Sequence, residues 1–166
     1  MRRSWLASGH ARLERFNVKL ALSTMVTVRT LIASELAWAN ERYGEIHFMP
    51  SQLSDFIAVA EVDNVKVGLG RLVPVDGTTG ELGGIYVLPA FRGRKVAYSI
   101  VNFLLQHSPY QQLFCIPFAH LEGFYQGFGF HPVSDKAAVP CVVAEKVNWC
   151  AKEYPASVNL LLREAA

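Results

Sequence analysis

The sequence has no long apolar run and few charged residues, and both shortages narrow the classes of protein to which it can belong. None of its 166 residues falls in an apolar stretch of 18 residues, so we expect no membrane-spanning helix. Charged residues make up only 18% of the chain and hydrophobic residues 51%. This balance favours a full core and leaves apolar surface that a second copy of the chain would cover, so a homodimer is one expectation.

Cysteines are also few. Cys115, Cys141 and Cys150 are odd in number and lack the spacing of metal ligands, so we expect free thiols, no metal and a cytoplasmic location. The net charge of +2 does not indicate a nucleic-acid-binding protein. A dinucleotide-binding fold is disfavoured because no G-x-G-x-x-G motif follows a strand.

The length fits one domain, which we place at residues 25–166. Residues 1–24 carry five bases against one acid, a composition typical of mitochondrial targeting segments. The alternative is that translation starts at Met25 and that this basic head is a disordered extension. We favour the extension, because chain termini are commonly poorly ordered.

The stretch from Glu81 to Gln106 organises the rest of the chain. Gly84–Leu88 is an apolar, β-branched and aromatic run that Pro89 ends, which predicts a strand. From Ala97 onward apolar residues recur at helical spacing. Arg92-Gly93-Arg94-Lys95 lies where this helix begins, so its free amides and cations predict an anion site. The alternative is that the three cations form a solvated turn.

Strands and helices alternate over the remaining chain. Asp63-Asn64 separates two strand-like runs and predicts a tight hairpin. We expect Trp149, in the last helix, to pack against the sheet. The expected strands are 25–30, 56–62, 65–75, 84–88, 112–117, one opening at Phe130, and 157–162, and the expected helices are 31–43, 93–107, 119–126 and 140–154.

Two segments resemble the GCN5-related N-acetyltransferases (GNAT superfamily). The run V-x-P-x-F-R-G-R-K-V-A at Val87–Ala97 is similar to the family's acyl-CoA loop, Q/R-x-x-G-x-G/A, with Arg92 in the first position and Lys95 in place of the first motif glycine. Gly123–Phe130 is similar to the family's F-Y-x-x-x-G-F signature. Their order and spacing agree with the family as well.

The resemblance implies an α/β fold with a mixed, mostly antiparallel central sheet flanked by helices, here with an extra helix before the last strand. It also implies acetyl-CoA as acyl donor, with its pantetheine arm along the central strand, and no metal. A bulge at Gly83-Gly84 would free an amide for the thioester oxyanion. By position, the residues implied to bind the cofactor are Ile85, Tyr86, Val87, Arg92, Gly93, Arg94, Lys95, Val96, Ala97 and Tyr98.

The implied reaction is direct attack of a primary amine, on a small molecule or a peptide, on acetyl-CoA in a ternary complex. Tyr125 aligns with the family's proton donor to the departing thiolate; its alternative role is that of a core aromatic residue. Glu81 is the first candidate for the base and Glu61 the second. Glu45 and His47 lie in the loop that commonly walls the family's acceptor pocket, and are candidate substrate contacts.

A non-catalytic acyl-CoA-binding regulatory module is the alternative function. It is kept open by Lys95 and by Phe118, which stands where the family often has an asparagine. The Tyr125 segment favours the enzyme, because a pure sensor needs no proton donor.

Overall fold

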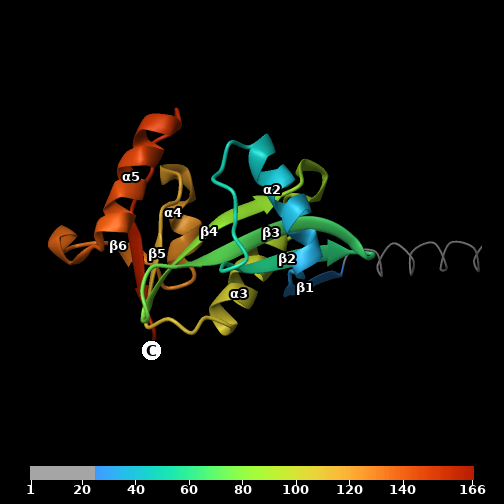
Figure 1. Ribbon diagram of the computed structural model, residues 1–166, viewed down its shortest axis with the longest axis horizontal. Coiled ribbons are helices and arrows are strands. Elements are labelled where there is room, and N and C mark those ends of the chain that lie inside the picture. The colour runs from blue at the N-terminus through green and yellow to red at the C-terminus, as the bar shows by residue number, and fades with distance from the viewer. Residues whose placement is uncertain (1–24) are drawn as a thin grey trace, which may run out of the picture.

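The computed structural model describes residues 25–166, so the basic segment 1–24 and our interpretation of it lie outside the described residues. Figure 1 shows a single sheet with helices on both of its faces. The strands are β1 (Val26–Thr30), β2 (Phe56–Val62), β3 (Val65–Pro74), β4 (Thr79–Val87), β5 (Gln112–Cys115), β6 (His131–Pro132) and β7 (Leu161–Glu164). The helices are α2 (Leu36–Glu45), α3 (Val96–Gln106), α4 (Glu122–Gln126) and α5 (Cys141–Glu153), with 3-10 turns η1 (Ala33–Glu35), η2 (Pro89–Phe91), η3 (Ala119–Leu121) and η4 (Lys136–Ala138).

The seven strands follow the order β1-β2-β3-β4-β5-β7-β6. Only β4 and β5 are parallel, and the other neighbours are antiparallel. The last strand therefore inserts between β5 and β6, and α5 precedes it in the chain. The predicted mixed, mostly antiparallel sheet is confirmed. Within residues 25–166, no helix is both long enough and apolar enough to cross a membrane.

The two faces of the sheet are covered by different helices. Apolar residues of α3, among them Val96, Ile100 and Leu104, pack with Ala58 and Leu82 in the larger core cluster. On the other face, α2 forms a smaller cluster in which residues of the helix contact Leu69 and Tyr86. Figure 1 shows α2 and α3 on opposite sides of the central strands. The sheet is thus buried on both faces where β3 and β4 run through its middle.

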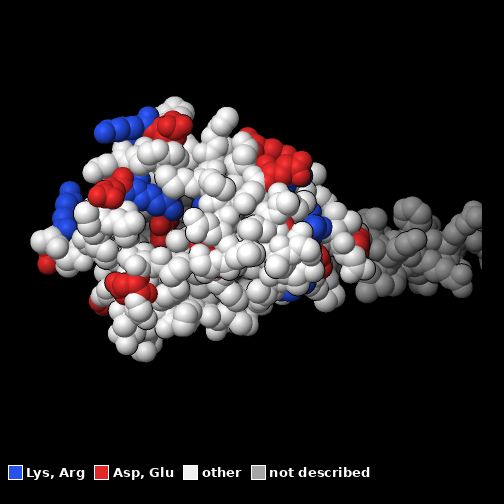
Figure 2. Space-filling view, viewed as in Figure 1, with Lys and Arg blue, Asp and Glu red and all other residues white. Residues whose placement is uncertain are grey.

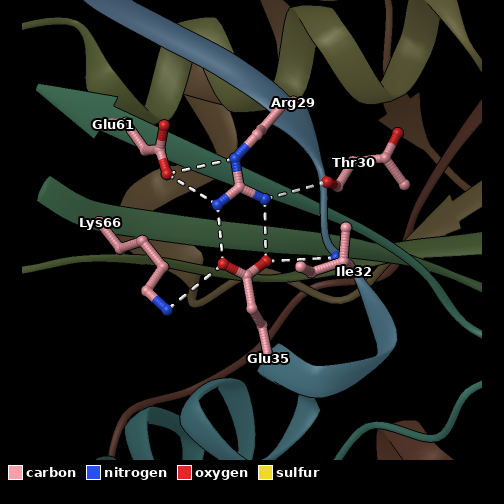
Figure 3. A network of polar contacts seen from close by, with 6 residues as sticks. All are labelled: Arg29, Thr30, Ile32, Glu35, Glu61 and Lys66. Carbon is pink, nitrogen blue, oxygen red and sulfur yellow. Dashed lines mark hydrogen bonds and ion pairs between the residues drawn. The ribbon is translucent and has the colours of Figure 1, made fainter. Parts of the chain in front are cut away.

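A network of ion pairs joins β1, β2 and β3 to the start of α2 (Figure 3). Arg29 contacts Glu35 and Glu61, each at 2.7 Å, and Lys66 lies 3.4 Å from Glu35. The hydrogen bond from Arg29 lowers the pKa of the Glu35 carboxyl to about 2. Because the pKa of Glu35 is lower in the folded state than in the unfolded state, its contact with Arg29 stabilises the fold at pH values above the unfolded-state pKa. This stabilisation is lost as the pH falls towards 2.

Several boundaries differ from the sequence-based expectation. The central strand begins at Thr79, five residues before Gly84, because its first half pairs with β3 as far as Pro74↔Gly80. Helix α3 begins at Val96 because Lys95 adopts a left-handed conformation with φ 61°. The last strand begins only at Leu161; the segment before it makes an isolated bridge to Phe118. The predicted Asp63-Asn64 hairpin is confirmed, with positive φ at both residues.

A β-bulge interrupts the pairing of β3 with β4 at the predicted glycines. The register passes from Leu69↔Tyr86 to Arg71↔Gly83, so β4 holds one extra residue. Gly84 has φ +61°, and a Cβ there would lie 2.5 Å from the Tyr43 hydroxyl oxygen. That hydroxyl donates a 2.8 Å hydrogen bond to the Gly84 carbonyl oxygen. The contact with α2 therefore leaves no room for a side chain at the bulge.

We predict that Gly84→Ala destabilises the fold by about 2–4 kcal/mol, because the change adds both left-handed strain and a steric clash. Urea denaturation would measure the free energy of unfolding. Gly77→Ala is the matched control, since a Cβ there meets nothing within 4 Å, and should change stability by less than about 0.5 kcal/mol. Equal effects of the two substitutions would contradict this account of the bulge.

Candidate active site

The site is built where the two parallel strands separate. β4 and β5 pair over only four residues, ending at Leu82↔Cys115. Beyond this point the chain after β5 pairs instead with the segment before β7: Ala119 N–H donates to the Ser157 carbonyl oxygen and Asn159 N–H to that of Pro117. The edge of β4 from Gly83 onward therefore has no neighbouring strand among the described residues. Two adjoining cavities occupy the opening.

The larger cavity, about 840 Å³, runs from the edge of β4 to the start of α3. Its lining combines an exposed strand edge, the loop before α3 and the first turn of that helix. Strand residues can pair with an extended ligand through backbone groups, as an added strand would. The lining residues are Ile85, Tyr86, Val87, Phe91, Arg92, Gly93, Lys95, Val96, Ala97, Tyr98, Leu121, Phe124 and Tyr125.

The start of α3 supplies positive charge to this cavity. Lys95, with φ 61°, is the residue before the helix, and the first amides of α3 have no partner within the helix. Arg92 is anchored by a 3.2 Å hydrogen bond from its Nε to the Val87 carbonyl oxygen. Backbone donors, the helix dipole and two cations thus converge on one end of the cavity, an arrangement suited to phosphate.

The smaller cavity, about 130 Å³, lies between the sheet and α5. Tyr154 sits at the centre of its aromatic wall: its ring packs edge-on against those of Phe48, Phe118 and Trp149, with centroids 5.5–5.8 Å apart. The Tyr154 hydroxyl donates to the His47 carbonyl oxygen at 3.0 Å, which ties the end of α5 to the loop after α2. These contacts enclose the cavity with side chains far apart in sequence.

Three charged side chains and a thiol face the smaller cavity. Glu81, 6% exposed, accepts a hydrogen bond from Lys146 Nζ at 2.5 Å. Arg71, on the neighbouring strand, is 4% exposed. Burial, with Glu81 as the next contribution, raises the pKa of the Cys115 thiol well above its ordinary value. Cys115 therefore stays protonated and is a poor nucleophile.

Tyr125 lies where the two cavities meet, because it lines both of them together with Ile85 and Leu121. Helix α4 carries it, and its ring packs edge-on against Phe124 and Phe130. Burial raises the pKa of the Tyr125 hydroxyl well above its ordinary value, so the phenol remains protonated near neutral pH. The hydroxyl makes no hydrogen bond with another described residue, which leaves it available to a ligand.

The structure brings most of the predicted site residues together and leaves four outside. All ten predicted cofactor residues except Arg94 line the larger cavity, and Glu81 and Tyr125 line the smaller one. Arg94 lies over the Phe91 ring, 5.5 Å from its centroid. Glu61 pairs with Arg29, and Glu45 pairs with Arg42 at 2.9 Å. His47 contributes its carbonyl oxygen to Tyr154, while its neighbours Phe48 and Met49 line the cavity.

Sequence reasoning missed part of the smaller cavity. The sequence predicts that Trp149 packs against the sheet, and the structure also gives it a place in the cavity wall, because α5 turns that side of the helix to the cavity. Lys146, one helical turn earlier, also went unnoticed. Arg71 had a visible signal, since it is a lone guanidinium between Gly70 and Leu72 in an otherwise apolar part of β3.

Comparison with known proteins agrees with this architecture. Residues 54–132 match the family model described as the acetyltransferase (GNAT) domain. No curated protein matches the sequence.

Solved structures share the fold at low sequence identity. Rv2747 from Mycobacterium tuberculosis, crystallised with CoA and a second ligand, has a TM-score of 0.67 at 18% identity, over 84% of this chain and 99% of that one. A GNAT family acetyltransferase from Elizabethkingia anophelis with acetyl-CoA bound has a TM-score of 0.62 at 18% identity, over 84% and 98%. N-acetylglutamate synthase from Neisseria gonorrhoeae, with CoA and N-acetyl-glutamate, has a TM-score of 0.63 at 12% identity, over 86% of this chain but only 35% of that one.

The family match, the parted parallel strands and the shared fold lead to one assignment: residues 54–132 of this chain hold a GCN5-related N-acetyltransferase (GNAT) domain.

Proposed function

We propose that this protein is an N-acetyltransferase that moves the acetyl group of acetyl-CoA to a primary amine of a small molecule. The observation that carries the proposal is the meeting of two unequal cavities at Tyr125. The larger one suits a long donor with phosphates at one end. The smaller one, about 130 Å³, is below the roughly 300–1,000 Å³ typical of ligand pockets, which favours a small acceptor over a peptide.

The donor would lie in the larger cavity. Its pyrophosphate would meet the free amides at the start of α3, with Arg92 and Lys95 nearby. Its pantetheine arm would follow Ile85–Val87, whose outer edge has no strand partner among the described residues. The crystal structures of two proteins of the same fold with CoA or acetyl-CoA bound support CoA as the donor.

The reaction would take place beside Tyr125. The neutral amine attacks the thioester carbonyl carbon, so that a C–N bond forms and the C–S bond breaks. The departing thiolate takes the phenolic proton of Tyr125, which stays protonated because burial raises its pKa. The amide nitrogen loses its extra proton to a base, for which Glu81 is the carboxylate that lines the smaller cavity.

Transfer through an acetylated cysteine is a less favourable route. Cys115 lines the smaller cavity, but burial raises its thiol pKa and little thiolate would be present near neutral pH. Direct transfer in a ternary complex therefore fits the site better.

The decisive test of the function is release of free thiol from acetyl-CoA by the purified protein with amino acids, polyamines, aminoglycosides and peptides as acceptors. We expect release with at least one small amine, and mass spectrometry should find an acetyl group on that amine. CoA binding without transfer to any acceptor would instead support the regulatory-module alternative.

We predict that Tyr125→Phe lowers the turnover number by about 10²- to 10⁴-fold, because it removes the proton donor and keeps the ring. The loss should shrink as the pH falls, since solvent then protonates the thiolate more readily. Steady-state kinetics, CoA affinity and melting temperature would be measured together. Tyr110→Phe is the matched control, because Tyr110 packs over Gly80 and lines neither cavity. Parental turnover with lowered stability would make Tyr125 a structural residue.

We also predict that Arg92→Glu weakens CoA binding roughly ten- to hundredfold, the range expected for a lost charge-assisted hydrogen bond. Pantetheine, which lacks the phosphates, should bind the variant as it binds the parent. Arg94→Glu makes the same change in charge outside the cavity and serves as control at physiological salt, where screening is strong. Equal losses for CoA and pantetheine would show that Arg92 does not face phosphate.

A further inference from the structure

Arg71 is a buried cation in the wall of the smaller cavity, where the acceptor would bind. It lies in the middle of β3 and is 4% exposed. Its Nη1 donates a 2.6 Å hydrogen bond to Ser51 Oγ, and its guanidinium lies over the Tyr43 ring, 4.5 Å from the centroid. Both contacts hold the planar group in one orientation.

Arg71 makes no ion pair with a carboxylate within residues 25–166. None of the six ion pairs in this part of the chain includes it, and Ser51 accepts its only hydrogen bond. Among the described residues, Arg42 Nε is the only side-chain nitrogen or oxygen that is both fully buried and without a hydrogen-bond partner. The remaining Arg71 nitrogens, which have no partner, are therefore not fully buried. An unpaired buried charge is costly, which points to an anion supplied by a ligand.

The other charges of the cavity are already balanced. Lys146 contacts Glu81 at 2.5 Å, so the cation and the carboxylate offset each other. The lining therefore carries a net charge of one positive unit, and that unit is Arg71. A ligand group with a single negative charge matches it better than a phosphate with two. A guanidinium with free donors in a planar fork is suited to a carboxylate.

The register of β3 with β4 also limits the distance between the amine and the carboxylate of an acceptor bound in this cavity. Arg71 pairs with Gly83, and Val73 with Glu81, so the side chains of Arg71 and Glu81 project from the same face as diagonal neighbours. Glu81 Oε1 lies 3.3 Å from the place where a Gly83 Cβ would be. An acceptor that reaches both groups would have its amine and its anion only a few bonds apart.

We propose that the acceptor is an amino acid, whose carboxylate is bound by Arg71 while its amine lies towards Glu81 and Tyr125. This inference rests on the proposed acetyltransfer. In it Arg71 is a substrate-binding residue that selects the acceptor.

The test uses matched acceptors with the parent protein. Each of the standard α-amino acids is compared with its carboxamide, which keeps the amine and the side chain and replaces the carboxylate with a neutral group. Because an amino-acid amide has the less basic amine, more of it is neutral and ready to attack, so preference for the acid must come from binding. We expect kcat/KM for the best amino acid to exceed that of its amide by at least about 100-fold.

Substitution at Arg71 assigns the preference to this residue. Arg71→Met, which removes the charge at similar bulk, should raise KM for the amino acid and reduce the acid-to-amide ratio to near one, with CoA affinity unchanged. Arg71→Lys should restore part of the ratio through its charge. An unchanged ratio in Arg71→Met would overturn the assignment. If Arg71→Met does not fold, the acid-to-amide ratios of the parent and of Arg71→Lys test the assignment. Equal ratios in these two proteins would overturn it.

A binding measurement distinguishes failure of this inference from failure of the proposed acetyltransfer. The melting temperature of the CoA-loaded protein is measured with N-acetyl amino acids and with their amides. A rise with the acids alone supports carboxylate recognition even if no acceptor is turned over, in which case only the catalytic proposal fails. Equal turnover or equal binding of acids and amides would overturn the inference about Arg71. Failure of every carboxylate compound to bind would overturn it too, and neither result would contradict the proposed acetyltransfer.

Discussion

The separation of β4 from β5 after Leu82 and Cys115 is the constraint on which the site depends. On one side, the bulge at Gly84 changes the register of β4 with β3, and the Tyr43 hydrogen bond fixes it against α2. On the other side, the chain after β5 pairs with residues 157–159. Both strands are therefore held apart by hydrogen bonds made elsewhere, and the opening between them is a fixed feature of the fold.

The two cavities in this opening differ in charge as well as in size. At the end nearest α3, helix amides and cations converge without a carboxylate in the lining. Beside α5, a paired Glu81 and Lys146 share a small space with Arg71, which makes no ion pair within residues 25–166. Figure 2 shows that charged side chains gather over α2 and around α5, with few across the middle of this face. Arg92 and Lys95 at the larger cavity and Arg71 at the smaller one are therefore placed where a bound ligand would meet them.

The sequence predicts the parts of this arrangement that depend on neighbours along the chain. The loop at Arg92, the helix after it and the hairpin at Asp63 each need only local signals, whereas the glycine bulge is expected from the family resemblance. The smaller cavity depends on contacts between distant segments: Lys146 meets Glu81 across 65 positions, and Arg71 meets Ser51 across 20. No local pattern shows that Glu61 is engaged by Arg29 or that α5 directs Trp149 towards the cavity. Long-range packing decides these positions.

We propose that CoA binds in the opening between β4 and β5, and isothermal titration calorimetry with CoA would measure this binding. We expect one molecule bound per chain with a micromolar dissociation constant. At a hundredfold excess over that constant, the folded state should gain about 2.7 kcal/mol, seen as a higher melting temperature. Absence of both binding heat and a melting shift at millimolar CoA would contradict the claim.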